Sequence, residues 1–300
     1  MYRVAGITKQ GFYKMRKRRQ KQAQEESNLV EIIRQVRKNH PTLCCRLMYH
    51  KIKPSFCGRD QFERICGEHG FLIKRSKSRR RTTDSRGVIR FENLVEDLEL
   101  TGIDQVWSSD ITYYEVGGRF YYITFVLDCH SRRILGHQVS KRLQTEHTTL
   151  PALKRALRAR NHQLPPGVIF HSDGGGQYYD DEFLALTADK KMQNSMCEYA
   201  YENGKVERLH GVIKNNYLTH WEIKSFSQLK HKVDRAVWLY NHDKPHTSLN
   251  KMTPIEFEAK MNNFNQQNRS TMKESVDAIY QINRASSPAL SEAEQVSESR

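Results

Sequence analysis

The sequence lacks several features that would define its class at once. It has no run of 18 or more apolar residues, so we expect no membrane-spanning helix. No apolar segment follows the basic N-terminus, so a secretion signal is not expected. The six cysteines form no Cys-x-x-Cys pair, which favours reduced thiols. A zinc site formed by Cys57, Cys66 and His69 stays open, although this spacing fits no common zinc finger.

Acidic residues are scarce in the first 90 positions, which hold 24 Lys and Arg against 7 Asp and Glu. The other 210 positions hold 25 against 27. Such uneven positive charge is typical of a protein that binds a polyanion. Nucleic acid is the leading candidate, because Lys and Arg neutralise phosphates and release counterions. A basic surface without a partner is the alternative that charge alone leaves open.

The basic first part of the chain predicts short helices. Apolar spacing and the breakers between the segments predict helices over 7–22, 27–39, 43–52 and 59–69. Short helices with strong positive charge are typical of a small DNA-binding unit, and a generic helical linker is the alternative. The candidate DNA contacts in this part are Arg18 and Arg19.

A nearly uninterrupted run of charged and polar residues follows over 74–86. This composition cannot bury itself, so it predicts a flexible or DNA-tracking linker. The candidate DNA contacts in the linker are Arg79, Arg80 and Arg81. At the other end, the last 30 or so residues are rich in Ser, Glu, Gln and Asn, which predicts a disordered tail.

The pattern changes near residue 104, where β-branched and aromatic residues form short runs. Five strands are predicted, over residues 106–116, 120–127, 133–139, 168–171 and 193–197. Helices are predicted over residues 145–161, 180–190, 206–219 and 227–241. The first three strands form an antiparallel meander. This order implies an α/β fold, a mixed five-stranded sheet with helices on both faces.

Three acidic residues stand out in this region. Asp110 is a carboxylate within an apolar and aromatic strand, and Asp173 follows the end of a short apolar strand and precedes three glycines. Ligands gather at the carboxyl ends of strands in such sheets. Glu207 opens a helix, where the helix dipole favours a carboxylate. Each has an ordinary structural interpretation by itself, as a strand edge, a glycine-rich turn or a helix start.

Taken together, the three carboxylates predict a metal site for phosphate chemistry. Mg²⁺ takes oxygen ligands, and two divalent ions can activate an attacking oxygen and stabilise the leaving one. Asp110 is the residue that we expect to bridge the two ions, with Asp173 and Glu207 each completing one of them. Lys214 lies seven residues after Glu207, on the same helix face, and is a candidate for phosphate contact.

Five motifs, in order, resemble the orfB-type transposases of the insertion-sequence-3 family. The motif residues are Trp107, Asp110, Ile111, Thr112 and Tyr113; Leu127, Asp128, Ser131 and Arg132; His171, Ser172, Asp173, Gly175, Gln177 and Tyr178; Asn203, Glu207, Arg208 and Lys214; and Tyr240, Asn241, Pro245, His246, Leu249, Thr253 and Pro254. The resemblance covers roughly residues 5–260. It implies a ribonuclease-H-like core of the retroviral-integrase type.

The sequence departs from the family pattern at a few positions. The spacing between Asp173 and Glu207 is one residue shorter than usual. Gly174 replaces a larger polar residue, and Lys244 replaces a common arginine. After His40-Pro41 the chain reads Leu-Cys-Cys-Arg, where the family usually has Tyr-Gly-Tyr-Arg. None of these changes removes an expected metal ligand.

The resemblance implies an enzyme that cuts DNA and joins its ends, with two Mg²⁺ ions that Mn²⁺ can replace. The catalytic and metal-binding residues would be Asp110, Asp173 and Glu207, and Asn203, Arg208 and Lys214 would contact DNA. The implied partners are terminal inverted repeats, target DNA, further copies of the chain and the product of an upstream reading frame. A bacterial, cytoplasmic location at the nucleoid is expected.

We expect a helical basic DNA-binding region over 1–73, a basic linker over 74–103, the catalytic core with C-terminal helices over 104–262, and a disordered tail over 263–300. Three other functions remain as alternatives. They are a non-catalytic DNA-binding regulator derived from a transposase, a ribonuclease-H-type nuclease without joining activity, and a tyrosine recombinase.

Overall fold

The computed structural model describes residues 6, 8–73, 90–197 and 204–264. Contacts divide the chain into one unit over Met1–Glu256 and another over Phe257–Arg300. Most of the predicted linker and nearly all of the predicted tail lie outside the described residues. Within the described part, no helix is both long enough and apolar enough to cross a membrane.

The N-terminal region is helical, as the sequence predicts, but its first two predicted helices are one. Helix α1 (Lys9–Asn39) runs without a break, and α2 (Cys45–Ile52) and α3 (Arg59–Glu68) follow it. The prediction of a break between residues 22 and 27 was wrong, because that stretch holds good helix formers and no Gly or Pro. A small apolar core joins the three helices, and it includes Leu29, Ile33, Met48, Phe62 and Ile65.

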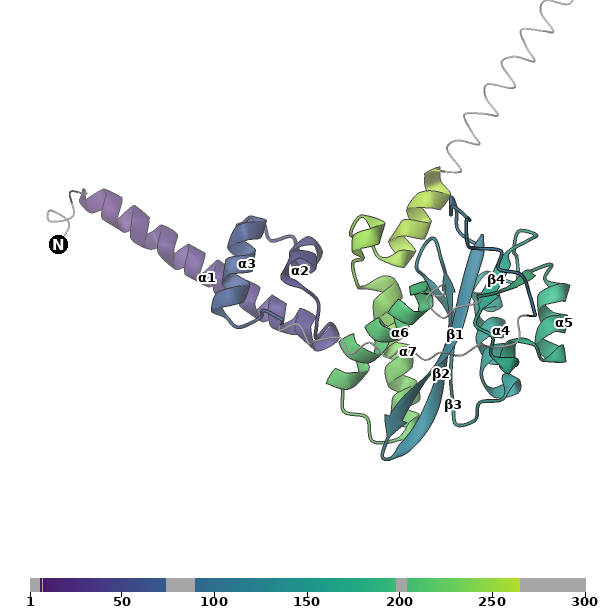
Figure 1. Ribbon diagram of the computed structural model, residues 1–300. Coiled ribbons are helices and arrows are strands. Elements are labelled where there is room, and N and C mark those ends of the chain that lie inside the picture. The colour runs from purple at the N-terminus through teal and green to yellow at the C-terminus, as the bar shows by residue number, and fades with distance from the viewer. Residues whose placement is uncertain (1–5, 7, 74–89, 198–203, 265–300) are drawn as a thin grey trace, which may run out of the picture. The chain divides into compact units, whose positions relative to one another are not determined.

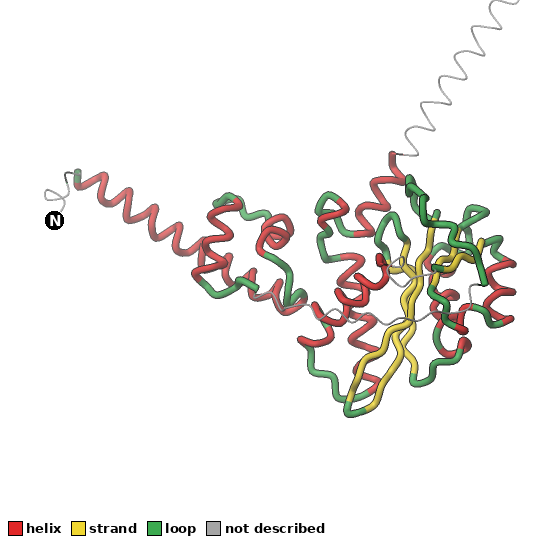
Figure 2. Tube along the Cα trace, in the orientation of Figure 1, coloured by secondary structure: helices red, strands yellow, loops and turns green. Residues whose placement is uncertain are grey.

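The five predicted strands form a single sheet in the order β3-β2-β1-β4-β5 (Figure 2). Strands β1 (Val106–Val116), β2 (Arg119–Asp128) and β3 (Ile134–Ser140) are antiparallel neighbours. Strands β4 (Ile169–Ser172) and β5 (Gln193–Met196) are added in parallel to β1. The predicted ribonuclease-H-like mixed sheet is therefore confirmed, and β1 is its central strand.

Helices cover both faces of the sheet (Figure 1). Helices α4 (Thr149–Ala159) and α5 (Asp181–Asp189) contribute to the apolar core on one face. Helices α6 (Gly204–Asn216) and α7 (Phe226–His242) contribute to the core on the other face. The predicted helices over 206–219 and 227–241 correspond to α6 and α7.

Strand β2 shows how the sequence divides its side chains between these two cores. Ile123, Phe125 and Leu127 belong to the core under α6 and α7, whereas Val126 belongs to the core under α4. Alternate residues of a strand point to opposite faces. Both faces are covered, so apolar residues occupy consecutive positions of the strand instead of alternating with polar ones.

Asp128 closes the turn between β2 and β3. Its side chain is fully buried and accepts hydrogen bonds from the backbone N–H groups of Asp104, His130 and Ser131, at 2.7, 3.0 and 2.6 Å. These bonds hold the turn in which Arg132 adopts a left-handed conformation with φ of 61°. This network gives Asp128 a structural role in the turn.

We predict that Asp128→Ala lowers the free energy of unfolding by about 2–3 kcal/mol, because one buried and two half-buried N–H donors lose their acceptor. Urea unfolding followed by circular dichroism measures the change. Asp189→Ala is the matched control, because that carboxylate is exposed and pairs with its neighbour Lys190. The control should stay within about 0.5 kcal/mol of the parent chain. Equal stability of the two variants would contradict the assigned role.

Candidate active site

Two aspartates lie at the same level of two neighbouring parallel strands, Asp110 within β1 and Asp173 directly after β4. Strand β1 pairs with β4, and the last pair in register is Ser109 with Ser172. Asp110 and Asp173 are the next residues along the two segments. Neighbouring strands lie about 4.8 Å apart. The register therefore brings together two carboxylates that are far apart in the sequence.

A buried hydrogen bond fastens the segment after Asp173 to the central strand. The hydroxyls of Ser109 and Tyr178 lie 3.0 Å apart, and the Ser109 hydroxyl donates to the Phe125 carbonyl at 2.9 Å. Tyr178 is itself buried. The chain that follows Asp173 is thus held at both ends, by β4 before it and by this bond after it.

Asp110 is strongly affected by its surroundings. Burial, followed by the negative charge of Asp173, raises the pKa of the Asp110 carboxyl to about 8. The charge of Glu207 raises that pKa further, whereas the Ile111 N–H, 2.7 Å from Oδ1, and the charge of Lys214 lower it. Burial also raises the pKa values of Asp173 and Glu207. The pKa of Asp110 therefore depends on the charges of both other carboxylates and on the partial loss of water around its side chain.

Helix α6 brings Glu207 to this site. The residue lies in the first turn of α6, and one turn later His210 places its Nδ1 3.4 Å from Asp110 Oδ2. Burial lowers the pKa of His210 to about 3, so the ring is neutral. The contact places the middle of α6 against Asp110.

Sequence reasoning did not single out His210. A signal was present, because residues three apart lie on one face of a helix and Glu207 precedes His210 by three positions. A buried histidine in a helix is commonly a core residue. Only the folded chain shows that its ring faces a carboxylate.

Lys214 is placed where the sequence predicts, on the face of α6 that carries Glu207. Its charge and that of Asp110 affect each other's pKa, although burial has the larger effect on the lysine and lowers its pKa. Its Nζ lies 5.1 Å from the centre of the Tyr113 ring. Phosphate contact by Lys214 stays a prediction that this position favours.

The other predicted DNA contacts are divided between described and undescribed parts of the chain. Arg208 is exposed on α6, and Arg18 and Arg19 are exposed on α1. Four of the predicted contacts lie outside the described residues: Asn203, Arg79, Arg80 and Arg81. Their roles stay predictions.

The donor chemistry of the site suits divalent cations. Burial, followed by the charge of Asp173, raises the pKa of Asp110, and a hard cation beside these carboxylates would stabilise their charged form. Within the described ranges, no three His, Cys, Asp or Glu side chains lie close enough together to hold a metal ion. Metal binding at these residues would therefore require their side chains to converge.

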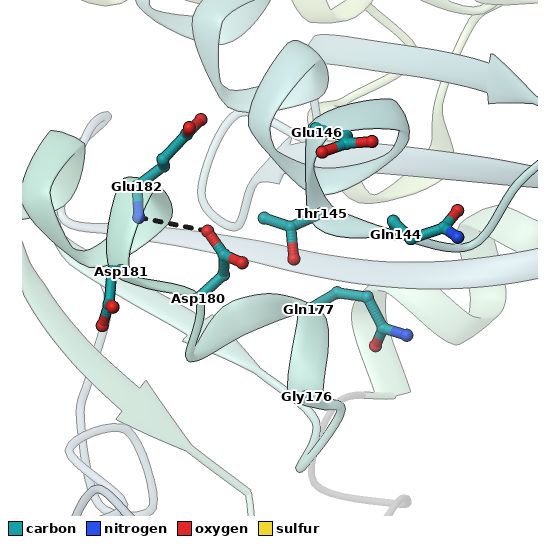
Figure 3. A pocket seen from close by; sticks show the side chains of 8 residues that line it. All are labelled: Gln144, Thr145, Glu146, Gly176, Gln177, Asp180, Asp181 and Glu182. Carbon is teal, nitrogen blue, oxygen red and sulfur yellow. Dashed lines mark hydrogen bonds between the residues drawn. The ribbon is translucent and has the colours of Figure 1, made fainter.

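A cavity of about 530 Å³ lies beside the segment that follows Asp173 (Figure 3). Its lining consists of Gln144, Thr145, Glu146, Gly176, Gln177, Asp180, Asp181 and Glu182. The Asp180 side chain accepts a hydrogen bond from the Glu182 N–H at 3.1 Å and caps α5. Four carboxylates and no basic side chain line this cavity, so it disfavours a phosphate.

Comparisons with known proteins agree with this arrangement. Two models of the integrase core domain match residues 101–201 and 190–254. The 31 kDa protein of insertion element IS600 from Shigella sonnei is 25% identical over 269 residues, which are 87% of this chain and 98% of that protein. The transposase InsF of IS3A from Escherichia coli K12 is 30% identical over 173 residues, which are 56% of this chain and 59% of that protein.

Among solved structures, the catalytic core domain of HTLV-2 integrase, in complex with magnesium, matches with a TM-score of 0.41 and 19% identity. The match covers 52% of this chain and 96% of that one. The two integrase core models together span residues 101–254, half of the chain, and include the segments that carry Asp110, Asp173 and Glu207. The chain therefore belongs to the integrase core domain family, and the curated proteins that it resembles include transposases of insertion sequences.

Proposed function

We propose that Asp110, Asp173 and Glu207 are the catalytic carboxylates of a transposase that cuts the ends of an insertion sequence and joins them to target DNA. The observation that carries this proposal is the register of β1 and β4, which sets Asp110 beside Asp173. The raised pKa of Asp110 supports it, because two neighbouring carboxylates and little water leave the site in need of positive charge.

The three carboxylates would hold two Mg²⁺ ions, and Mn²⁺ could replace them. Such ions activate an attacking hydroxyl and stabilise the leaving oxygen in an in-line displacement. The chain itself supplies position and charge. The pairing of β1 with β4 orients the aspartates, His210 holds α6 against Asp110, and Lys214 would neutralise a phosphate of the DNA.

The basic N-terminal region would hold the terminal inverted repeats largely through their phosphates, which position a protein without reading the sequence. Arg18 and Arg19 on α1, and Arg208 on α6, are the described residues that we assign to this task. Asn203 and the linker arginines 79–81 belong to the same proposal. Joining to two target positions needs two active sites, so we propose that copies of the chain assemble on DNA, at the bacterial nucleoid.

The test is a cut-and-join assay with DNA that carries the terminal repeats beside the coding sequence. Cleavage should require Mg²⁺ or Mn²⁺ and stop with a chelator. A pre-cut end should be joined to a second DNA, which separates a transposase from a nuclease without joining activity. Absence of a covalent protein–DNA link separates it from a tyrosine recombinase. If the chain alone binds the ends without cutting them, adding the upstream reading-frame product tests whether a partner is needed.

A further inference from the structure

Two aromatic rings lie exposed on the β1–β2 hairpin near the proposed site. Tyr113 and Phe120 are 54% and 56% exposed, although large apolar side chains in the rest of this sheet are mostly buried. Their ring centroids are 5.5 Å apart and the rings are perpendicular. The two residues support each other at the surface instead of joining either core.

The strand that carries Tyr113 has a free edge at this point. Pairing between β1 and β4 ends at Ser109, whereas pairing with β2 continues to Val116. Among the described residues, the second half of β1 therefore has a strand neighbour on one side only, and the hairpin extends past β4 and β5 (Figure 2). A ligand can approach this edge from the side where Asp110 and Asp173 lie.

Lys214 connects this edge with the carboxylates. Its Nζ lies over the Tyr113 ring, 5.1 Å from the centroid, and the lysine interacts electrostatically with Asp110. Strand alternation places Asp110 and Tyr113 on opposite faces of the sheet. The lysine, which comes from α6, is within range of both. Along this edge lie, one after another, the ring of Tyr113, the positive charge of Lys214 and the proposed catalytic carboxylates.

We propose that Tyr113, supported by Phe120, stacks against an unpaired base of the DNA next to the phosphate that is cut or joined. The inference rests on the proposed function and specifies how the site holds the DNA. From Asp110 to Tyr113 the extended strand advances three residues, or about 10 Å. This distance corresponds to about three base steps at 3.4 Å each. The base in contact is therefore within about three nucleotides of the reacting phosphate, and Lys214 binds a phosphate between them.

Nucleic acid fits this surface better than a protein partner. A stable protein interface needs about 800 Å² from each side, whereas the two half-exposed aromatic side chains together offer about 200 Å². A single base is the size of one ring, and base–aromatic stacking is sequence-tolerant. The cation beside the ring adds attraction for the phosphate that accompanies every base.

A double-mutant cycle between the ring and the base tests the inference. DNA binding is measured by fluorescence anisotropy with pre-cut terminal-repeat DNA that carries an abasic site at each of the three positions beside the reacting phosphate. At one position the parent chain should lose affinity by about 10-fold, within the range reported for one stacked base. Tyr113→Ala should lose the same affinity with intact DNA and lose nothing further with abasic DNA. Tyr113→Phe keeps the ring and should behave as the parent chain.

Photocrosslinking gives a readout that needs neither cleavage nor joining. DNA with 5-iodouracil at the responding position should crosslink to Tyr113 or Phe120, as identified by mass spectrometry. The inference would be overturned if the affinity losses from Tyr113→Ala and from the abasic site were additive at all three positions and the crosslink formed elsewhere. Cleavage by the parent chain would be unaffected by that result. Failure of the parent chain to cleave, with the crosslink present, would instead count against the proposed function. A change in oligomeric state of Tyr113→Ala, with additive losses, would show that the rings contact a second copy and would also overturn it.

Discussion

Asp110→Asn is expected to lower both cleavage and joining by at least about 1000-fold, which corresponds to about 4 kcal/mol of transition-state stabilisation. The reason is that Asp110 lies at the centre of the carboxylate set, beside Asp173 and within reach of the charge of Glu207. Rates are measured with pre-cut and uncut terminal-repeat DNA in Mg²⁺. DNA affinity should stay within about twofold of the parent chain, because the basic region is unchanged.

Glu115→Gln is the matched control for this substitution. Glu115 is an exposed carboxylate on the same strand, five residues further along, so its removal changes the net charge equally. We expect cleavage by this variant close to that of the parent chain. Full activity of Asp110→Asn in Mg²⁺ would reject the catalytic assignment, whatever the control does.

Asp110→Asn should also change the free energy of unfolding in the absence of metal. The pKa of Asp110 is raised from 3.8 to about 8 in the folded chain, so the folded state keeps a proton that the unfolded state loses above pH 4. The parent chain should therefore lose stability, relative to Asp110→Asn, as the pH rises from about 4 to about 8. Urea unfolding in a chelator at pH 5, 7 and 9 measures this difference. If the difference in free energy of unfolding between Asp110→Asn and the parent chain became smaller with rising pH, the argument from burial would be contradicted.

The second large effect is expected from Gly136→Ala on β3. A Cβ at this position would lie 2.1 Å from the carbonyl oxygen of Ala152 and 2.8 Å from the backbone nitrogen of Ala156. Both atoms belong to the backbone of α4, so no side chain can move aside, and the helix must shift away from the sheet. We expect the free energy of unfolding to fall by about 3 kcal/mol, as measured by urea denaturation.

Gly211→Ala on α6 is the control for the change from glycine to alanine. The nearest atom to its added Cβ is Asn215 Nδ2 at 3.9 Å, which is ordinary contact. Alanine is favoured over glycine within a helix, so this variant should gain about 0.5–1 kcal/mol. The two substitutions should thus have opposite signs. Equal stability of Gly136→Ala and the parent chain would show that α4 is not held closely against β3.

The sequence by itself determined the order and approximate bounds of the strands and the helices of the core, and it singled out three carboxylates as the proposed catalytic residues. Strand and helix patterns are local, and the motifs around Asp110, Asp173 and Glu207 each occupy a short segment of the chain. The same local reasoning failed on α1, where apolar spacing divided a helix that the intervening good helix formers continue without a break.

Only the tertiary structure decided how these segments meet. The register of β1 against β4 places Asp110 beside Asp173, and the packing of α6 brings His210 to the same carboxylate. Burial then raises the pKa of Asp110, and the free edge of β1 leaves Tyr113 exposed. Each of these properties depends on groups that are distant in the sequence and on the water that folding removes. For that physical reason no local pattern could specify them.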